Sequence, residues 1–186
     1  MNRLLLVLAS TVLAACAHMS TSTPSTVSPE LRAEFAPSGT LVAGVNLGNP
    51  VIAQKDPAGG APRGVGPELA RELARRLGVP IRYVTYDTAG KMADGVKKGE
   101  WDVAMLAVDP ARAEDIAFSA PYVQIEGTYM VRKDSPLKRI EEFDRAGVKI
   151  AVGLKTAYDL FLTRELKQAT LVRSGSSIAA VEQFRA

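Results

Sequence analysis

A short apolar run near the middle of the chain limits the folds that this sequence can adopt. Six uncharged residues, Val103 to Val108, lie between Asp102 and Asp109. The run is too short for a typical helix, and its length is typical of a strand buried on both faces, as in a parallel sheet. We therefore expect a central strand over residues 103–108, and with it an α/β fold.

Asp109 and Pro110 follow this strand directly. Asp is a strong helix N-cap and Pro is tolerated in the first turn, so a short helix is expected to begin there. Arg112 then lies at the carboxyl edge of a sheet, where open α/β folds bind ligands. A cation in a first helical turn opposes the helix dipole and gains from a nearby anion. The alternative is a surface ion pair of Arg112 with Asp109 or Asp115, which contributes little.

The residues before this run alternate between strand and helix patterns. Strands are expected at 41–45 and 81–84, and helices at 68–77 and 91–98. This order predicts a parallel, doubly wound sheet. A second series follows, with a strand at 148–152, a helix at 157–166 and a strand at 171–173. Leu160 and Phe161 are expected to face inward, and Ser176 or Ser177 to cap a last helix.

The composition excludes several classes of chemistry. The chain has 186 residues and a net charge of +3, with basic and acidic residues interleaved, so nucleic-acid binding is not indicated. Cys16 and His18 are the sole Cys and His. Ser-His-Asp and Cys-His mechanisms and a Cys/His metal site are therefore excluded, and we expect no metal and no cofactor. No pair of acids between residues 102 and 115 is spaced to flank a scissile bond, so we expect no enzyme.

The N-terminus resembles a bacterial lipoprotein signal. A basic start precedes the apolar stretch Leu4 to Leu13, and Leu13-Ala14-Ala15-Cys16 looks like a lipobox. Residues 1–16 are thus predicted to be signal peptide and lipobox, with lipidated Cys16 holding the protein at a membrane. The alternative is a plain secretory peptide. Residues 17–37 are expected to form a polar tether and a short helix capped by Ser28.

The segment from Asp102 to Tyr122 resembles the family 3 extracellular solute-binding proteins. The shared order is Asp102, an apolar strand, Arg112 and then Ile116-Ala117-Phe118-Ser119-Ala120-Pro121-Tyr122. The resemblance, which extends from about Leu41 to the C-terminus, implies a two-lobed, type II periplasmic-binding-protein fold. It also implies that Arg112, six residues before Phe118, holds the α-carboxylate of a ligand.

The same resemblance divides the chain. Residues 38–122 are expected to form a nearly complete lobe one and residues 123–133 a crossover containing a hinge strand. Residues 134–186 are expected to form a partial lobe two. Family members carry further residues that complete this lobe, so we expect the chain to be truncated at its C-terminus.

Four further residues are candidates for ligand contacts. Asn46 can donate to a ligand or bond its own backbone, and Asp109 can face the cleft or only cap the helix. Thr156 matches the lobe-two carboxylate-binding turn of the family, although it can equally be a simple cap. Tyr158 can cover a ligand or pack against the protein.

The resemblance implies a substrate-binding lipoprotein of an ABC importer on the periplasmic side of a membrane. Its expected partners are a carboxylate-bearing solute, an ABC permease and a membrane reached through the lipid anchor, and the protein is expected to be a monomer. Met105 and Ala107 occupy positions where amino acid receptors of the family usually have hydroxyl residues. The ligand is therefore expected to be either an amino acid or an organic acid. The alternatives are a cyclohexadienyl dehydratase-like enzyme, a sensor or scaffold lipoprotein, and an inactive truncated product.

Overall fold

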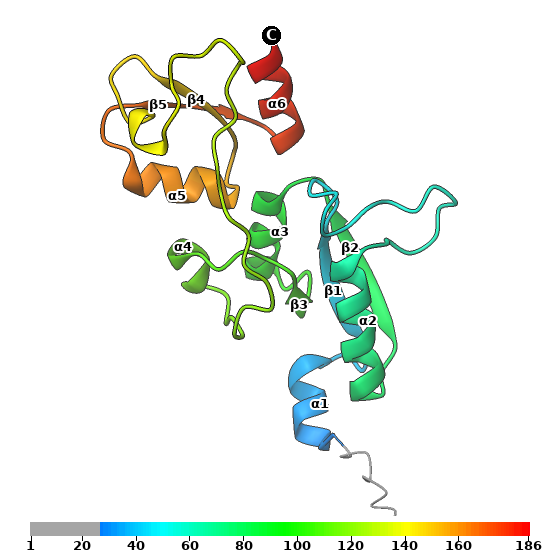
Figure 1. Cartoon of the computed structure of the whole chain (residues 1–186). Helices are drawn as coiled ribbons and strands as arrows, with labels where there is room; N and C mark the ends of the chain where they lie inside the picture. The colour runs from blue at the N-terminus through cyan, green and yellow to red at the C-terminus, as the bar shows by residue number, and fades with distance from the viewer. Residues whose placement is uncertain (1–26) are drawn as a thin grey trace, which may run out of the picture.

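The computed structural model describes residues 27–186 as two α/β lobes joined by a long crossover (Figure 1). The predicted signal peptide, Cys16 and the tether up to residue 26 lie outside the described residues. Within the described part, none of the helices combines the length and the apolar character that crossing a membrane requires. The predicted short helix is confirmed as α1 (Pro29–Phe35), where the Ser28 side chain accepts from the Leu31 N–H.

Lobe one is built on a parallel three-stranded sheet. The strands β1 (Leu41–Asn46), β2 (Ile81–Tyr86) and β3 (Val103–Ala104) lie in the order β2-β1-β3. The central strand β1 is buried over Leu41–Val45, as its apolar sequence on both faces requires. Helices α2 (Val65–Leu77) and α3 (Ala89–Gly95) both contact β1, and the 3₁₀ turn η1 (Val96–Lys98) follows α3.

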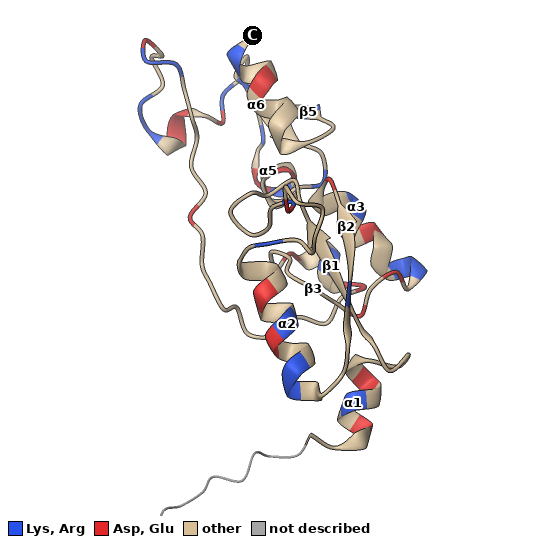
Figure 2. Ribbon diagram, turned by 90° about the vertical axis from the view of Figure 1, so that its right-hand side faces the viewer, with Lys and Arg blue, Asp and Glu red and all other residues tan. Residues whose placement is uncertain are grey.

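The charged residues of α2 lie on its outer face. Its buried residues include Ala70, Ala74 and Leu77, while Glu72 pairs with Arg75 on the outside. Acidic and basic residues are interleaved along this helix (Figure 2). The helix begins at Val65, three residues before the predicted start. Its last residue is Leu77, and the following Gly78 caps it in the left-handed conformation.

The strand expected over 103–108 is much shorter than predicted. Only Val103 and Ala104 pair with β1, opposite Ala43 and Gly44. Val103 and Ala104 are half-buried, and Val108 is exposed. The prediction of burial on both faces was wrong, and β3 also lies at the edge of the described sheet, so one side of its backbone has no partner strand there.

The crossover contains no strand in the described structure, although the family resemblance implied one. Residues 121–128 are all exposed, and the segment runs as an extended connection between the lobes (Figure 1). A strand needs a hydrogen-bonded neighbour, and none of the described strands pairs with this segment. Its end is anchored because the Tyr129 ring stacks on Phe143 of lobe two, with 4.1 Å between the ring centroids.

Lobe two contains a two-stranded parallel sheet and two α-helices. After the 3₁₀ turn η2 (Ile140–Glu142) come β4 (Lys149–Gly153), α5 (Ala157–Glu165), β5 (Thr170–Ser174) and α6 (Ser177–Arg185). Its core consists of Phe143, Ile150, Val152 and Leu162. Phe161, which was expected to face inward, is 54% exposed, because Leu162 is the residue of α5 that faces this core.

Candidate functional site

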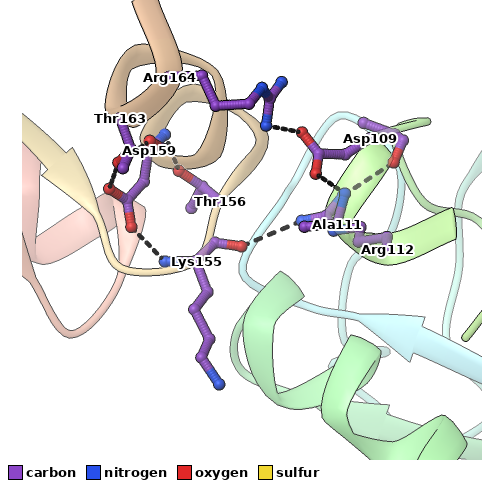
Figure 3. Close-up of polar contacts among 9 residues, drawn as sticks. Asp109, Ala111, Arg112, Lys155, Thr156, Asp159, Thr163 and Arg164 are labelled. Atoms are coloured by element: carbon purple, nitrogen blue, oxygen red, sulfur yellow. Dashed lines mark hydrogen bonds and ion pairs between the residues drawn. The ribbon is translucent and has the colours of Figure 1, made fainter. Parts of the chain in front are cut away.

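Arg112 lies where the two lobes meet, on the short helix α4 (Pro110–Ala113). The predicted cap is present, because one carboxylate oxygen of Asp109 accepts from the Ala111 N–H at 2.9 Å. The Arg112 side chain is buried, and its two terminal nitrogens donate to main-chain carbonyls (Figure 3). Nη1 donates to Ala107 of lobe one at 3.0 Å, and Nη2 donates to Lys155 of lobe two at 3.1 Å.

The guanidinium of Arg112 has no charged partner in the described structure. Asp109 pairs instead with Arg164 at 2.8 Å, and Asp115 pairs with Lys97 at 2.9 Å. The surface ion pair considered for Arg112 is therefore not formed. Its Nε is buried without a hydrogen-bond partner. Burial lowers the pKa of Arg112 below its ordinary value, opposed by the charge of Asp109, so an anion at this position would stabilise the cation.

A hollow of about 170 Å³ lies beside Arg112, between α3, α4 and the start of α5. Four other charged side chains line it: Asp94, Lys97, Asp115 and Lys155. They form the pairs Lys155–Asp94 and Lys97–Asp115, at 2.8 and 2.9 Å. Arg112 is thus the one charged residue of this lining without an ion pair in the described structure.

Asn46 lies apart from this hollow. Its side-chain oxygen accepts from the Gly48 N–H at 2.9 Å, which is the local backbone bond considered for it. It lines a separate, very small cavity of about 10 Å³ together with Met105. The structure therefore does not bring Asn46 and Arg112 to one cavity.

Thr156 and Tyr158 are also absent from the lining of the hollow. Thr156 is buried and caps α5, because its hydroxyl accepts from the Asp159 N–H and donates to the Gly153 carbonyl. Tyr158 is 54% exposed. Its ring lies beside the crossover, since a Cβ built on Gly127 would be 3.5 Å from Tyr158 Cε1.

Two lobe-two residues that the sequence did not suggest complete the junction. Lys155 has a left-handed backbone with φ of 56°, and its N–H donates to Asp159 at 2.8 Å. Its carbonyl thereby faces Arg112, while its ammonium reaches Asp94. Arg164, on the last turn of α5, reaches Asp109 (Figure 3). These contacts join positions 43 to 61 residues apart, so no local sequence pattern could have indicated them.

Comparisons with known proteins all find extracellular or amino-acid-binding proteins. The family described as bacterial extracellular solute-binding proteins, family 3, matches residues 41–183. The chain is 26% identical over 129 residues to the amino-acid-binding protein AabA of Dichelobacter nodosus, covering 68% of this chain and 49% of that protein. It is 37% identical over 95 residues to the probable ABC transporter extracellular-binding protein YckB of Bacillus subtilis (strain 168), covering 49% of this chain and 32% of that protein. The chain thus spans half or less of these curated relatives.

Solved structures show the same likeness. An ancestral amino acid-binding protein, AncCDT-1, described as a precursor of cyclohexadienyl dehydratase, superposes with a TM-score of 0.69 and 26% identity. The match covers 83% of this chain and 69% of that chain. A truncated, arginine-bound ArgBP from T. maritima gives a TM-score of 0.63 and 25% identity, over 82% of this chain and 71% of that one. The fold is thus that of a type II, two-lobed periplasmic binding protein whose second lobe is partial here. The chain belongs to the family 3 bacterial extracellular solute-binding proteins.

Proposed function

We propose that this chain is the binding component of an ABC importer and that Arg112 holds the carboxylate of an amino acid. The family match supports a solute-binding role, and the relatives are named as an amino-acid-binding protein and an ABC transporter binding protein. The predicted lipid anchor at Cys16, a periplasmic location and a monomeric state belong to this proposal.

The observation that carries the proposal is the uncompensated charge of Arg112. A buried cation is costly unless it is paired, and carbonyl oxygens supply only partial charges. A carboxylate can accept two parallel N–H bonds from a guanidinium, which matches the unpartnered Nε and one of the terminal nitrogens. A carboxylate carries a full negative charge, so its bonds to the guanidinium are stronger than those of a neutral carbonyl, which it can displace.

Basic amino acids are the first ligands to test. Neighbouring structures are described as complexes with arginine and with lysine. The hollow beside Arg112 also carries Asp94 and Asp115, whose carboxylates can exchange their lysine partners for a ligand cation. None of Asn46, Thr156 and Tyr158 lines the hollow. We still propose Thr156 and Tyr158 as ligand contacts from lobe two and Asn46 as a ligand contact from lobe one, for a ligand that extends beyond the hollow.

Calorimetry with the purified chain tests the role of Arg112. We expect L-arginine or L-lysine to bind and argininamide, which lacks the carboxylate, to bind at least about ten-fold more weakly. Arg112→Gln should produce the same loss for the free amino acids and little further loss for the amide. Arg82→Gln, which removes an exposed charge from β2, is the matched control. Equal affinities of wild-type protein and Arg112→Gln for every amino acid tested would place the carboxylate elsewhere.

An enzymatic role on the same fold is the competing function, since one structural neighbour is described as a precursor of a dehydratase. We favour binding because both acids that line the hollow are ion-paired with lysines rather than placed as an acid/base pair. A product assay with prephenate and arogenate separates the two roles. Turnover that disappears in Arg112→Gln would replace the binding proposal by catalysis.

A further inference from the structure

The carboxylate of Asp109 is shared between two elements of different lobes. Oδ1 accepts from the Ala111 N–H at 2.9 Å and caps α4, while Oδ2 accepts from Arg164 Nη1 of α5 at 2.8 Å (Figure 3). The Asp109 side chain is only 4% exposed, whereas that of Arg164 is 40% exposed. One buried acid thus joins the helix that carries Arg112 to the helix that docks from lobe two.

The position of Arg112 depends on this cap. Helix α4 has only four residues, far fewer than an isolated helix needs for stability, so its geometry relies on its N-cap. The Arg112 N–H itself donates to the Asp109 carbonyl at 3.0 Å. A change in the Asp109 side chain would therefore move the first turn of α4 and the guanidinium with it.

Arg164 supplies the charge that keeps Asp109 in place. Without it the buried carboxylate would retain one N–H donor, and a buried carboxylate that loses its ionic partner is strongly disfavoured. The carboxylate would then turn toward solvent, and this movement weakens its bond to the Ala111 N–H. An exposed ion pair would have no such effect, because water would replace the missing partner.

We infer that Arg164 is a positioning residue that orders Arg112 for ligand binding only when lobe two is docked on lobe one. The inference rests on the proposed function, because it takes Arg112 as the ligand contact. The Arg112 guanidinium is then ordered for a carboxylate at the same moment as α5 docks on lobe one. Separated lobes therefore bind the ligand more weakly. The ligand class that benefits is the free amino acid proposed above.

The first test needs no ligand. Hydrogen–deuterium exchange of the full chain is compared for wild-type protein, Arg164→Gln and Arg164→Lys, with Arg145→Gln as the matched control on lobe two. Arg145 is exposed and forms only a 3.6 Å pair with Glu142, remote in sequence from α4 and α5. We expect Arg164→Gln to speed exchange about ten-fold in both 109–116 and 153–159, with Arg164→Lys restoring much of the protection.

The second test is calorimetry of the same proteins with L-arginine and L-lysine. We expect Arg164→Gln to weaken binding about ten-fold, although Arg164 does not line the hollow, and to leave the unfolding midpoint of lobe one unchanged. Unchanged exchange of residues 109–116 in Arg164→Gln would overturn the inference, as would unchanged affinity. If the wild-type protein binds none of these amino acids, the proposed function fails, and the exchange data still decide whether Arg164 orders α4.

Discussion

Gly90 allows the two lobes to approach each other closely, and adding one methyl group there should separate them. Gly90 is the second residue of α3 and is buried. A Cβ built on it would lie 2.7 Å from Lys155 Cβ, 3.2 Å from Lys155 Cδ and 3.5 Å from the Leu154 carbonyl oxygen. The Lys155 Cβ cannot yield as a flexible side-chain end would, because it is fixed to a left-handed backbone.

The expected effects of Gly90→Ala on docking and on lobe one have opposite signs. Overpacking costs about 1–3 kcal/mol, which is about a 5- to 150-fold shift of the docking equilibrium toward separated lobes. Within lobe one, replacing a helical Gly by Ala stabilises the folded state by about 0.5–1 kcal/mol. The substitution should therefore loosen the junction while leaving lobe one as stable as before or more so.

Two measurements on one variant distinguish these effects. Exchange of residues 153–159 reports docking, and fluorescence of Trp101, the sole Trp and a buried residue of lobe one, reports unfolding of that lobe. Gly175→Ala is the control, because a Cβ at Gly175 would meet no atom within 4 Å. Unchanged exchange at 153–159, or a lower Trp101 unfolding midpoint in Gly90→Ala, would refute the reasoning.

Two further predictions concern single elements. Ser176→Ala should destabilise α6 by about 1 kcal/mol, because the Ser176 hydroxyl accepts from the Ala179 N–H, and thermal unfolding should show no comparable loss for the exposed neighbour Ser177→Ala. Burial, aided by a 2.7 Å hydrogen bond to Glu100, raises the pKa of Tyr86 from 10.0 to about 12. Since the folded state favours the protonated phenol, this contribution to stability is complete below pH 10.0 and lost as the pH rises to about 12. Spectrophotometric titration should find that Glu100→Gln lowers this pKa only part of the way, and an unchanged pKa would contradict the assigned bond.

Local signals predicted the caps well. Ser28 and Asp109 each accept a main-chain N–H in the first turn of a helix, as their side-chain chemistry and position indicated, and of the two candidates Ser176 and Ser177 it is Ser176 that caps α6. The helix start at Asp109 was enough to place Arg112 beyond the carboxyl end of β3. These features depend on neighbours within a few residues, so the sequence contains the information that fixes them.

Features that depend on distant partners were not predictable. The apolar run 103–108 was expected to be fully buried, but only Val103 and Ala104 pair with β1, and they lie at the edge of the described sheet. Phe161 and Leu162 are adjacent apolar residues, and only the packing of lobe two decides which one faces the core. The role of Arg164 depends on an acid 55 positions earlier, so its sequence neighbourhood gives no sign of it.

Among residues 27–186 the lobes are connected by the crossover alone, and its length affects how strong the contacts at their junction must be. A short connecting segment keeps two tethered partners at an effective concentration in the millimolar range. Partners at that concentration are half associated when their intrinsic dissociation constant is about 1 mM, which corresponds to about 4 kcal/mol. The contacts across the junction include two ion pairs and one arginine–carbonyl bond, so a solute that binds the joined lobes more tightly than the parted ones would shift the population toward the joined state.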